Sequence, residues 1–150
     1  MQQPTSHYYH AVYGVTVDVA TDSQKGILRA HYIERPEFRS LGFRDKDYGW
    51  FGQAGTKVLG PKGHGLFAYA GIGRMEGYVK ADPEQIATNV TERKYALPGP
   101  TASVEYAWSL GPVDLAVNHQ TFIGYVSQEE VEAYVAWPYN FFLLQAGVRW

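Results

Sequence analysis

The chain has no cysteine among its 150 residues, which excludes disulfide bonds, zinc sites with thiolate ligands and cysteine nucleophiles. It also has no run of about 18 apolar residues, the length that a transmembrane helix requires, and its mean hydropathy is −0.30. The formal net charge of −2 argues against a nucleic-acid-binding protein, because such proteins are normally basic. The length fits a single domain over residues 1–150, with one core or one closed barrel.

Aromatic residues and glycine are abundant. Aromatic side chains make up 15% of the sequence, with 12 tyrosines and 4 tryptophans, and there are 16 glycines. A membrane-spanning β-barrel with rings of aromatic residues at the two membrane interfaces has this composition.

Met1 is followed by Gln-Gln-Pro-Thr-Ser and not by the basic and then apolar segment of a signal peptide. We therefore expect the chain to correspond to a mature exported protein.

Residues 140–150 form the clearest predicted strand. The even positions from Phe142 to Trp150 are all apolar, whereas Gln145, Gly147 and Arg149 occupy odd positions. This period of two predicts a β-strand with one continuous apolar face. A last strand of this kind that ends on an aromatic residue resembles the closing strand of bacterial outer-membrane barrels.

The same alternation recurs along the whole chain and predicts about eight strands. The predicted strands cover residues 8–19, 27–35, 48–59, 66–79, 101–110, 113–126, 130–137 and 140–150. No stretch predicts a helix with any strength. We therefore expect an all-β fold, specifically a transmembrane, antiparallel up-and-down β-barrel of about eight strands.

Two segments that contain proline, residues 36–46 and 80–100, are predicted to be loops. Both join an even strand to an odd one, where an eight-stranded outer-membrane barrel has short periplasmic turns. A different division of the chain is open. The even-numbered face keeps its parity from Glu132 to Trp150, so residues 130–150 could form one long strand. That division gives seven strands and leaves an unpaired edge.

The polar faces of the predicted strands are expected to line the barrel. Eight strands enclose a space that side chains fill, so we expect a salt-bridged interior and not a conducting pore. A soluble calycin-like barrel that binds a ligand in an apolar lumen is an alternative, and it would reverse the two faces. The residues expected inside are Arg29, His31, Gln53, Lys57, Arg74, Glu76, Glu105, Gln145 and Arg149.

His119 and Thr121 are the candidate catalytic residues, together with Glu132. His119 and Thr121 lie two apart on a predicted strand and therefore point to the same face. A hydroxyl nucleophile needs a base, and the base needs an orienting acid. Glu132 reaches His119 only if residues 122–129 form a loop, because a tight turn separates the two by about 20 Å. The alternative for His119 is a histidine at the membrane interface or hydrogen-bonded within the sheet.

At these residues the last third of the chain resembles the outer-membrane lipid A 3-O-deacylases. That family is an eight-stranded barrel with a His-x-Ser pair on one late strand and a glutamate on the next, facing the lipid. Here His119-Gln120-Thr121 stands at the His-x-Ser and Glu132 at the acid, with Thr121 in place of serine and Phe122 in place of an asparagine. The resemblance implies a bacterial outer-membrane enzyme that hydrolyses an acyl ester of lipid A.

The expected partner is a membrane lipid or lipopolysaccharide, and we expect no cofactor and no metal. A non-catalytic barrel, structural or adhesive through the segment 80–100, is the alternative to the enzyme. The two differ in whether His119 is required for release of fatty acid.

Overall fold

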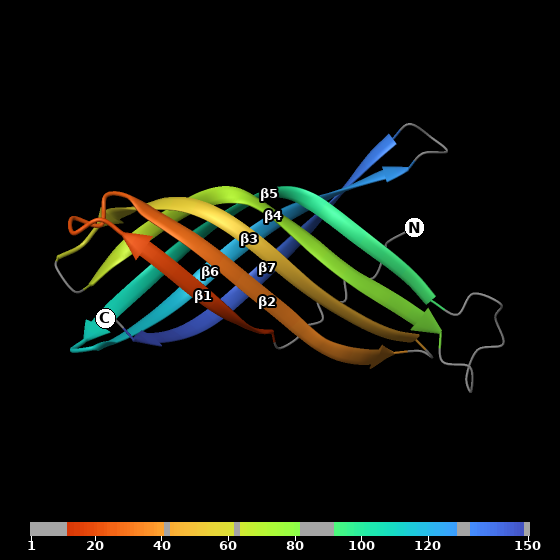
Figure 1. The fold of residues 1–150 in the computed structure, drawn as a ribbon, viewed down its shortest axis with the longest axis horizontal. Helices are drawn as coiled ribbons and strands as arrows, with labels where there is room; N and C mark the ends of the chain where they lie inside the picture. Colours follow the sequence, from red (N-terminus) through yellow and green to blue (C-terminus); the bar gives the residue numbers. More distant parts are fainter. Residues whose placement is uncertain (1–11, 41–42, 62–63, 82–91, 129–132, 149–150) are drawn as a thin grey trace, which may run out of the picture.

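The computed structural model describes residues 12–40, 43–61, 64–81, 92–128 and 133–148. In this part of the chain the fold is all-β, with seven strands in one sheet in which each strand pairs with the next along the chain. Every pairing is antiparallel, and the up-and-down sheet curls into an incomplete barrel (Figure 1). The strands are β1 (Tyr13–Ala20), β2 (Ile27–Ser40), β3 (Phe43–Leu59), β4 (His64–Ala81), β5 (Glu92–Leu110), β6 (Val113–Gln128) and β7 (Ala133–Val148).

The barrel has two ends that differ in their connections. The end on the left of Figure 1, here called the turn end, holds the β1–β2, β3–β4 and β5–β6 connections and the end of β7. The turn after β1 is closed by the hydrogen bond from Thr21 N to Gly26 O at 2.9 Å. Gly111 has a φ of 68°, a conformation that glycine adopts at little cost in the tight β5–β6 turn. The opposite end, called the loop end, is where β2, β4 and β6 end and β3, β5 and β7 begin.

The final strand confirms the alternative division of the chain. β7 runs as one strand through Ala133–Val148 and pairs with β6 from Gln128 to Val113. The prediction of separate strands over residues 130–137 and 140–150 is therefore wrong. Pro138 does not break the strand, because it continues the ladder opposite Ile123. The expected count of about eight strands becomes seven in the described residues.

Both predicted loops are largely strand. Residues 36–40 belong to β2 and residues 43–46 to β3, with a register shift between Arg35 and Phe38 that absorbs Pro36. Residues 80–81 end β4 and residues 92–100 begin β5, so that only 82–91, which lie outside the described residues, remain of the segment 80–100. For the described residues of both segments the loop predictions are wrong, because proline was taken as a strand breaker. Pro98 and Pro100 pair with β4, while the described β5–β6 register begins only at Thr101.

The interior prediction is confirmed for part of its residues. Arg29, His31, Gln53 and Glu105 are each 4–5% exposed and point inward. The prediction is wrong for Arg74, whose side chain is 59% exposed, and for its partner Glu76, because the odd-numbered face of β4 is the buried one. Arg149 lies outside the described residues.

The interior contains buried apolar residues on both sides of its polar residues. A small cluster of Ile27, Phe67 and Tyr69 lies at the turn end. The larger one, here called the apolar cluster, consists of Ile33, Phe51, Met75, Leu97 and Phe122, with Phe122 fully buried. It lies toward the loop end, because these residues follow the polar inward positions along their strands in that direction. Among the described residues there is no helix of the length and hydrophobicity that a membrane crossing requires.

Candidate functional site

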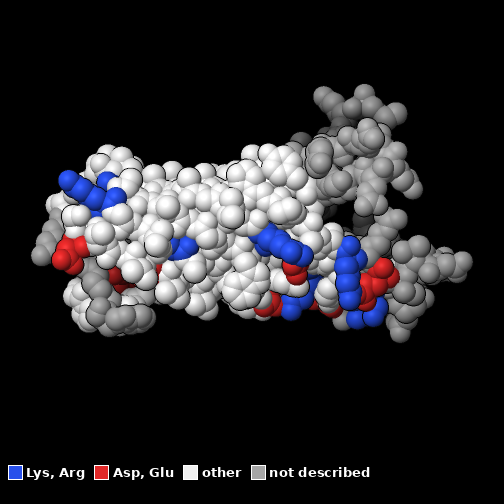
Figure 2. Space-filling model, turned by 45° about the horizontal axis from the view of Figure 1, so that its top comes forward, with Lys and Arg blue, Asp and Glu red and all other residues white. Residues whose placement is uncertain are grey.

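The outward faces of the seven strands form an apolar belt, defined by its exposed large hydrophobic residues. Leu144 is 87% exposed, Ile72 75% and Phe142 70%. Charged outward residues lie mainly toward the loop end, although Arg74, whose side chain is 59% exposed, pairs with the belt residue Trp50. Figure 2 shows a broad uncharged surface, with charged side chains in the lower half of the view and at the two ends of the barrel. The belt comprises Tyr13, Val15, Val17, Val19, Leu28, Trp50, Ile72, Val104, Tyr106, Leu115, Val117, Phe142, Leu144 and Val148.

His119 and Thr121 lie within this belt on the outward face of β6. The expectation that they share a face is confirmed by the alternating burial of β6, in which Asn118, Gln120 and Phe122 point inward. The His119 ring stacks on Phe142 of β7 with ring centroids 4.5 Å apart and planes at 21°. The Thr121 hydroxyl donates to Asn140 Oδ1 at 2.9 Å. The hydroxyl and the imidazole are therefore held by different partners on the same neighbouring strand.

The strand register decides which residues flank the pair. His119 pairs with Phe142 and Thr121 with Asn140 on β7, while Val104 and Ala102 occupy the corresponding positions on β5. The two neighbouring strands thus place no carboxylate directly beside His119. The predicted acid, Glu132, lies outside the described residues. The loop over residues 122–129 that it required to reach His119 is not formed, because β6 continues as a strand to Gln128. Asn140 is the polar partner that the sequence analysis missed, because finding it required the exact β6–β7 register.

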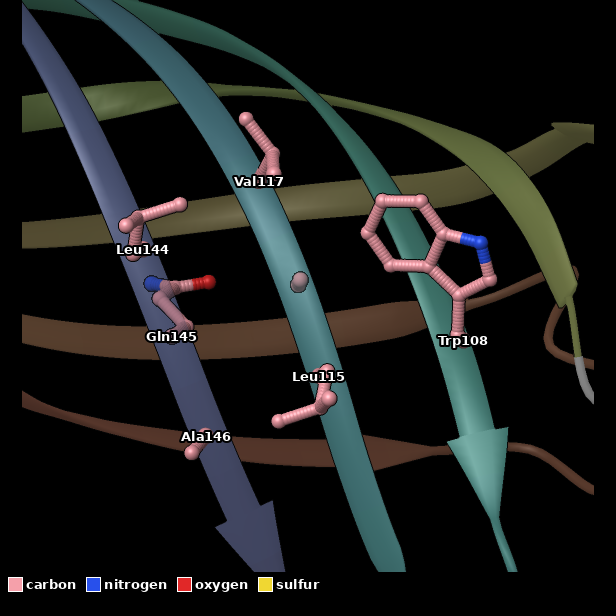
Figure 3. Close-up of a pocket in the computed structure, with 7 residues that line it drawn as sticks. Trp108, Leu115, Val117, Leu144, Gln145 and Ala146 are labelled. Atoms are coloured by element: carbon pink, nitrogen blue, oxygen red, sulfur yellow. The ribbon is translucent and has the colours of Figure 1, made fainter.

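An apolar groove lies beside His119 on the same outer surface. It has a volume of about 520 Å³ and is lined by Trp108, Leu115, Ala116, Val117, Leu144, Gln145 and Ala146. Figure 3 shows the indole of Trp108 on β5 beside the side chains of Leu115 and Val117 on β6. His119 follows Val117, and Phe142 precedes Leu144, on the same faces of their strands. The groove therefore leads along β6 and β7 to the His119–Phe142 stack.

The interior near the turn end holds a network of charges around Arg29. Its guanidinium donates to Asp18 at 2.7 and 2.8 Å and to Glu105 at 2.7 and 3.0 Å, and lies 3.9 Å from the centre of the Tyr69 ring. Asn118 Nδ2 donates to Glu105 Oε2 at 3.1 Å. Charges taken out of water need such partners, and bidentate pairs of arginine with carboxylate are the strong ones. The network therefore fills the lumen with paired polar groups.

A second polar layer lies between this network and the apolar cluster. Gln53 Nε2 donates to Ser103 Oγ at 3.3 Å, and Gln120 Nε2 donates to Thr101 Oγ1 at 3.1 Å. Gln120 is 1% exposed, so its side chain is shielded from solvent at this level of the barrel. Side chains fill the inside of the barrel at these levels, as expected for a small barrel. A cavity of about 230 Å³, lined by Ile33, Asp47, Met75 and Phe141 among others, lies further toward the loop end.

The outer surface beyond the belt at the loop end is rich in tyrosine and charge. Glu34 accepts a hydrogen bond from Tyr32 at 2.8 Å and forms an ion pair with Lys46. Hydrogen bonds to the Glu34 carboxylate lower its pKa to about 2; the Lys46 ammonium has the largest effect, and the hydroxyls of Tyr32 and Tyr13 have smaller ones. Tyr48 likewise donates to Glu76 at 2.7 Å. Aromatic residues with a polar tip are typical of the boundary between an apolar and an aqueous phase.

Comparisons of the chain with family models, with curated proteins and with solved structures gave no match. The function therefore rests on the geometry of the belt, the groove and the interior. In the described part of the chain, no three His, Asp or Glu side chains are grouped so that they could hold a metal ion.

Proposed function

We propose that this protein is an integral β-barrel of the bacterial outer membrane whose lumen is filled and does not conduct. The apolar belt is the observation that carries the proposal. A soluble monomer rarely exposes one apolar patch larger than a few hundred Å², whereas a membrane barrel needs a band of outward apolar residues flanked by aromatic rings. Strands of 14–19 residues from β2 to β7 exceed the roughly 9–11 residues that a bilayer crossing requires.

The distribution of polar residues supports the same proposal. The paired charges Arg29 and Glu105 are buried inside, whereas Leu144 and Ile72 are exposed outside. A soluble ligand-binding barrel with an apolar lumen requires the opposite arrangement of faces. The filled cross-section at Gln120 and Phe122 favours a barrel without a pore.

The test begins with solubility. We expect the purified protein to require detergent to remain monodisperse, and to insert into liposomes without making them permeable to ions. A protein that stays monodisperse without detergent would overturn the membrane proposal. Ion conductance in planar bilayers would overturn the filled lumen while leaving the membrane location intact.

A second candidate function, hydrolysis of an acyl ester of a membrane lipid, is favoured by the groove beside His119. Its lining is almost entirely apolar, and it leads to an imidazole and a hydroxyl on the surface that would face lipid. An acyl chain fits such a groove, and its ester then lies near the polar pair. The expected substrate is a lipid of the outer leaflet such as lipopolysaccharide.

The proposed reaction uses the hydroxyl of Thr121 as the nucleophile and the imidazole of His119 as the base. The Thr121 hydroxyl attacks the ester carbonyl while His119 takes its proton, and the tetrahedral intermediate expels the alcohol, which receives that proton from His119. Water, deprotonated by His119, then releases the fatty acid and restores Thr121. The hydroxyl must first turn from Asn140 Oδ1 toward His119.

Three variants test this step. His119→Ala and Thr121→Ala should abolish fatty-acid release from lipopolysaccharide, while Thr121→Ser should keep it, because serine supplies the same hydroxyl. His64→Ala is the matched control, since His64 is an exposed histidine at the turn end. Unchanged release in His119→Ala, or no release by the unaltered protein, would remove the enzymatic candidate and leave a non-catalytic barrel.

A further inference from the structure

The two edge strands of the sheet, β1 and β7, face each other across a gap here called the seam. In the described residues β1 pairs with β2 and β7 with β6, and no Cα atom of β1 lies within 8 Å of a Cα atom of β7. Hydrogen-bonded strands lie about 4.7–4.9 Å apart. The two edges are therefore too far apart to pair directly.

One side-chain contact sets an upper limit on the width of the seam. Gln145 Nε2 of β7 donates to Thr16 Oγ1 of β1 at 3.3 Å. Fully extended side chains of glutamine and threonine add about 5 and 2.5 Å, so the two Cα atoms lie at most about 11 Å apart. At the level of Thr16 and Gln145, the gap between 8 and about 11 Å accommodates one strand, since two strand spacings amount to about 9.5 Å.

The direction of such a strand follows from the topology. β1 and β7 are both odd members of an up-and-down sheet and therefore run in the same direction. Direct pairing of the two would be parallel, whereas a single strand between them can be antiparallel to both. It would bring the barrel to eight strands, an even number that closes an antiparallel sheet without an edge.

We propose that the seam binds an extended segment of a separate polypeptide, which adds as a strand antiparallel to both β1 and β7. Its main-chain groups pair with the two open edges, and its outward residues continue the apolar belt between Val17 and Leu144. The binding goes beyond the membrane location proposed above, because it follows from the width and direction of the seam. In a bilayer, closure becomes more favourable still, since lipid-exposed sheet edges leave backbone groups without partners.

The residues on the inner face of the seam determine which side chains the bound segment can have at its inward positions. The network contains two carboxylates, Asp18 and Glu105, for one guanidinium, and the Asp18 side chain on β1 is 35% exposed. A lysine or arginine on the inward face beside Asp18 therefore complements the charge. At the level of Thr16, the side chain of Gln145 crosses the seam, so the inward residue there must be small. The expected pattern is apolar outward, with a basic and a small residue inward.

The absence of cysteine allows a direct test by disulfide formation. Val17→Cys on β1 and Leu144→Cys on β7 each introduce one outward thiol. The probe is a synthetic ten-residue peptide with valine at outward positions, glycine, serine and lysine at inward positions, and one outward cysteine. A matched peptide carries the cysteine one position later, on the inward face. Val117→Cys on β6 is the control variant, because both neighbours of β6 are already paired.

The outward-cysteine peptide should form a disulfide with Val17→Cys and with Leu144→Cys at least ten times faster than with Val117→Cys, and ten times faster than the matched peptide does. A cysteine near the peptide N-terminus should react with Val19→Cys, and one near its C-terminus with Val15→Cys, if the strand is antiparallel. Mass spectrometry identifies each product. The reaction is performed in detergent, or in buffer if the protein needs none, so that its result is independent of the membrane proposal.

Four results would overturn the inference. Equal reaction at Val117→Cys would mean that the peptide binds nonspecifically, and no reaction at either edge would mean that the seam is already filled or is not accessible. A disulfide between Val17→Cys and Leu144→Cys in the double variant without peptide would mean that the edges meet directly. A disulfide-linked dimer of Val17→Cys in preference to the peptide adduct would assign the edge to a second copy of this chain.

Discussion

Arg29 of β2 reaches Glu105 of β5 across the inside of the barrel, with Nη1 2.7 Å from Oε2, although the two residues are 76 positions apart in the sequence. Both side chains are almost fully buried. The pair therefore connects two strands that are not neighbours in the sheet. Each charge offsets the free-energy cost of burying the other.

Arg29→Met should destabilise the fold strongly, because it leaves Glu105 buried without a cation. Removing one partner of a buried ion pair costs about 3–5 kcal/mol, which denaturant unfolding measures. The double variant Arg29→Met, Glu105→Leu should recover much of this loss, because the buried carboxylate is then absent, and Asp18, whose side chain is 35% exposed, keeps its access to water. A loss below about 1 kcal/mol in the single variant would show that solvent reaches Glu105.

Gly71→Ala should destabilise the β3–β4 pair, because a Cβ at Gly71 would lie 1.9 Å from the backbone oxygen of Gly52. Backbone atoms cannot move aside as a flexible side chain does, so a cost of about 1–3 kcal/mol is expected. Gly52→Ala on the neighbouring strand is the matched control, since nothing lies within 4 Å of a Cβ there. Equal stability of the two variants would contradict this account.

The period of two in the sequence correctly indicated strands and, for β2 and β5, which face is outward. It failed on β4, where Phe67, Tyr69 and Met75 are buried while Arg74 is exposed. Hydrophobicity alone could not orient this strand, because the barrel interior contains an apolar part as well as charges. The orientation follows only from the neighbours Phe51 and Leu97, which come from other strands.

The candidate site was predictable in part for a similar reason. The spacing of His119 and Thr121 was sufficient to place them on one face of a strand. Their partners Phe142 and Asn140 depend on the β6–β7 register, which one residue more or less in the connection would change. The same register shows that β7 is a single strand, a point that parity had left open.

Replacing Lys46 by Met should raise the pKa of Glu34 from about 2 toward its ordinary value, because the ammonium is the main cause of the depression. The pKa of Glu34 is lower in the folded protein than in the unfolded chain. Its contribution to stability is therefore complete above about pH 4.3 and is lost as the pH falls to about 2. NMR titration of the Glu34 carboxyl carbon measures the pKa directly. Lys25→Met, an exposed lysine at the turn end, should leave it unchanged.

The loss of stability caused by Leu144→Arg should show whether the belt faces lipid or water. Leu144 is 87% exposed and lies between Phe142 and Ala146 on the outward face of β7. In a bilayer, an arginine near the midplane of a barrel strand costs about 2–4 kcal/mol, whereas exposed substitutions in water cost about 0.5 kcal/mol or less. We expect the large loss when unfolding is measured from liposomes. Asp22→Arg in the β1–β2 turn is the control, and it should have little effect in either medium because that turn is exposed. Equal stabilities of the Leu144→Arg protein and the unaltered protein would place the belt in water and remove its role as a membrane-facing surface.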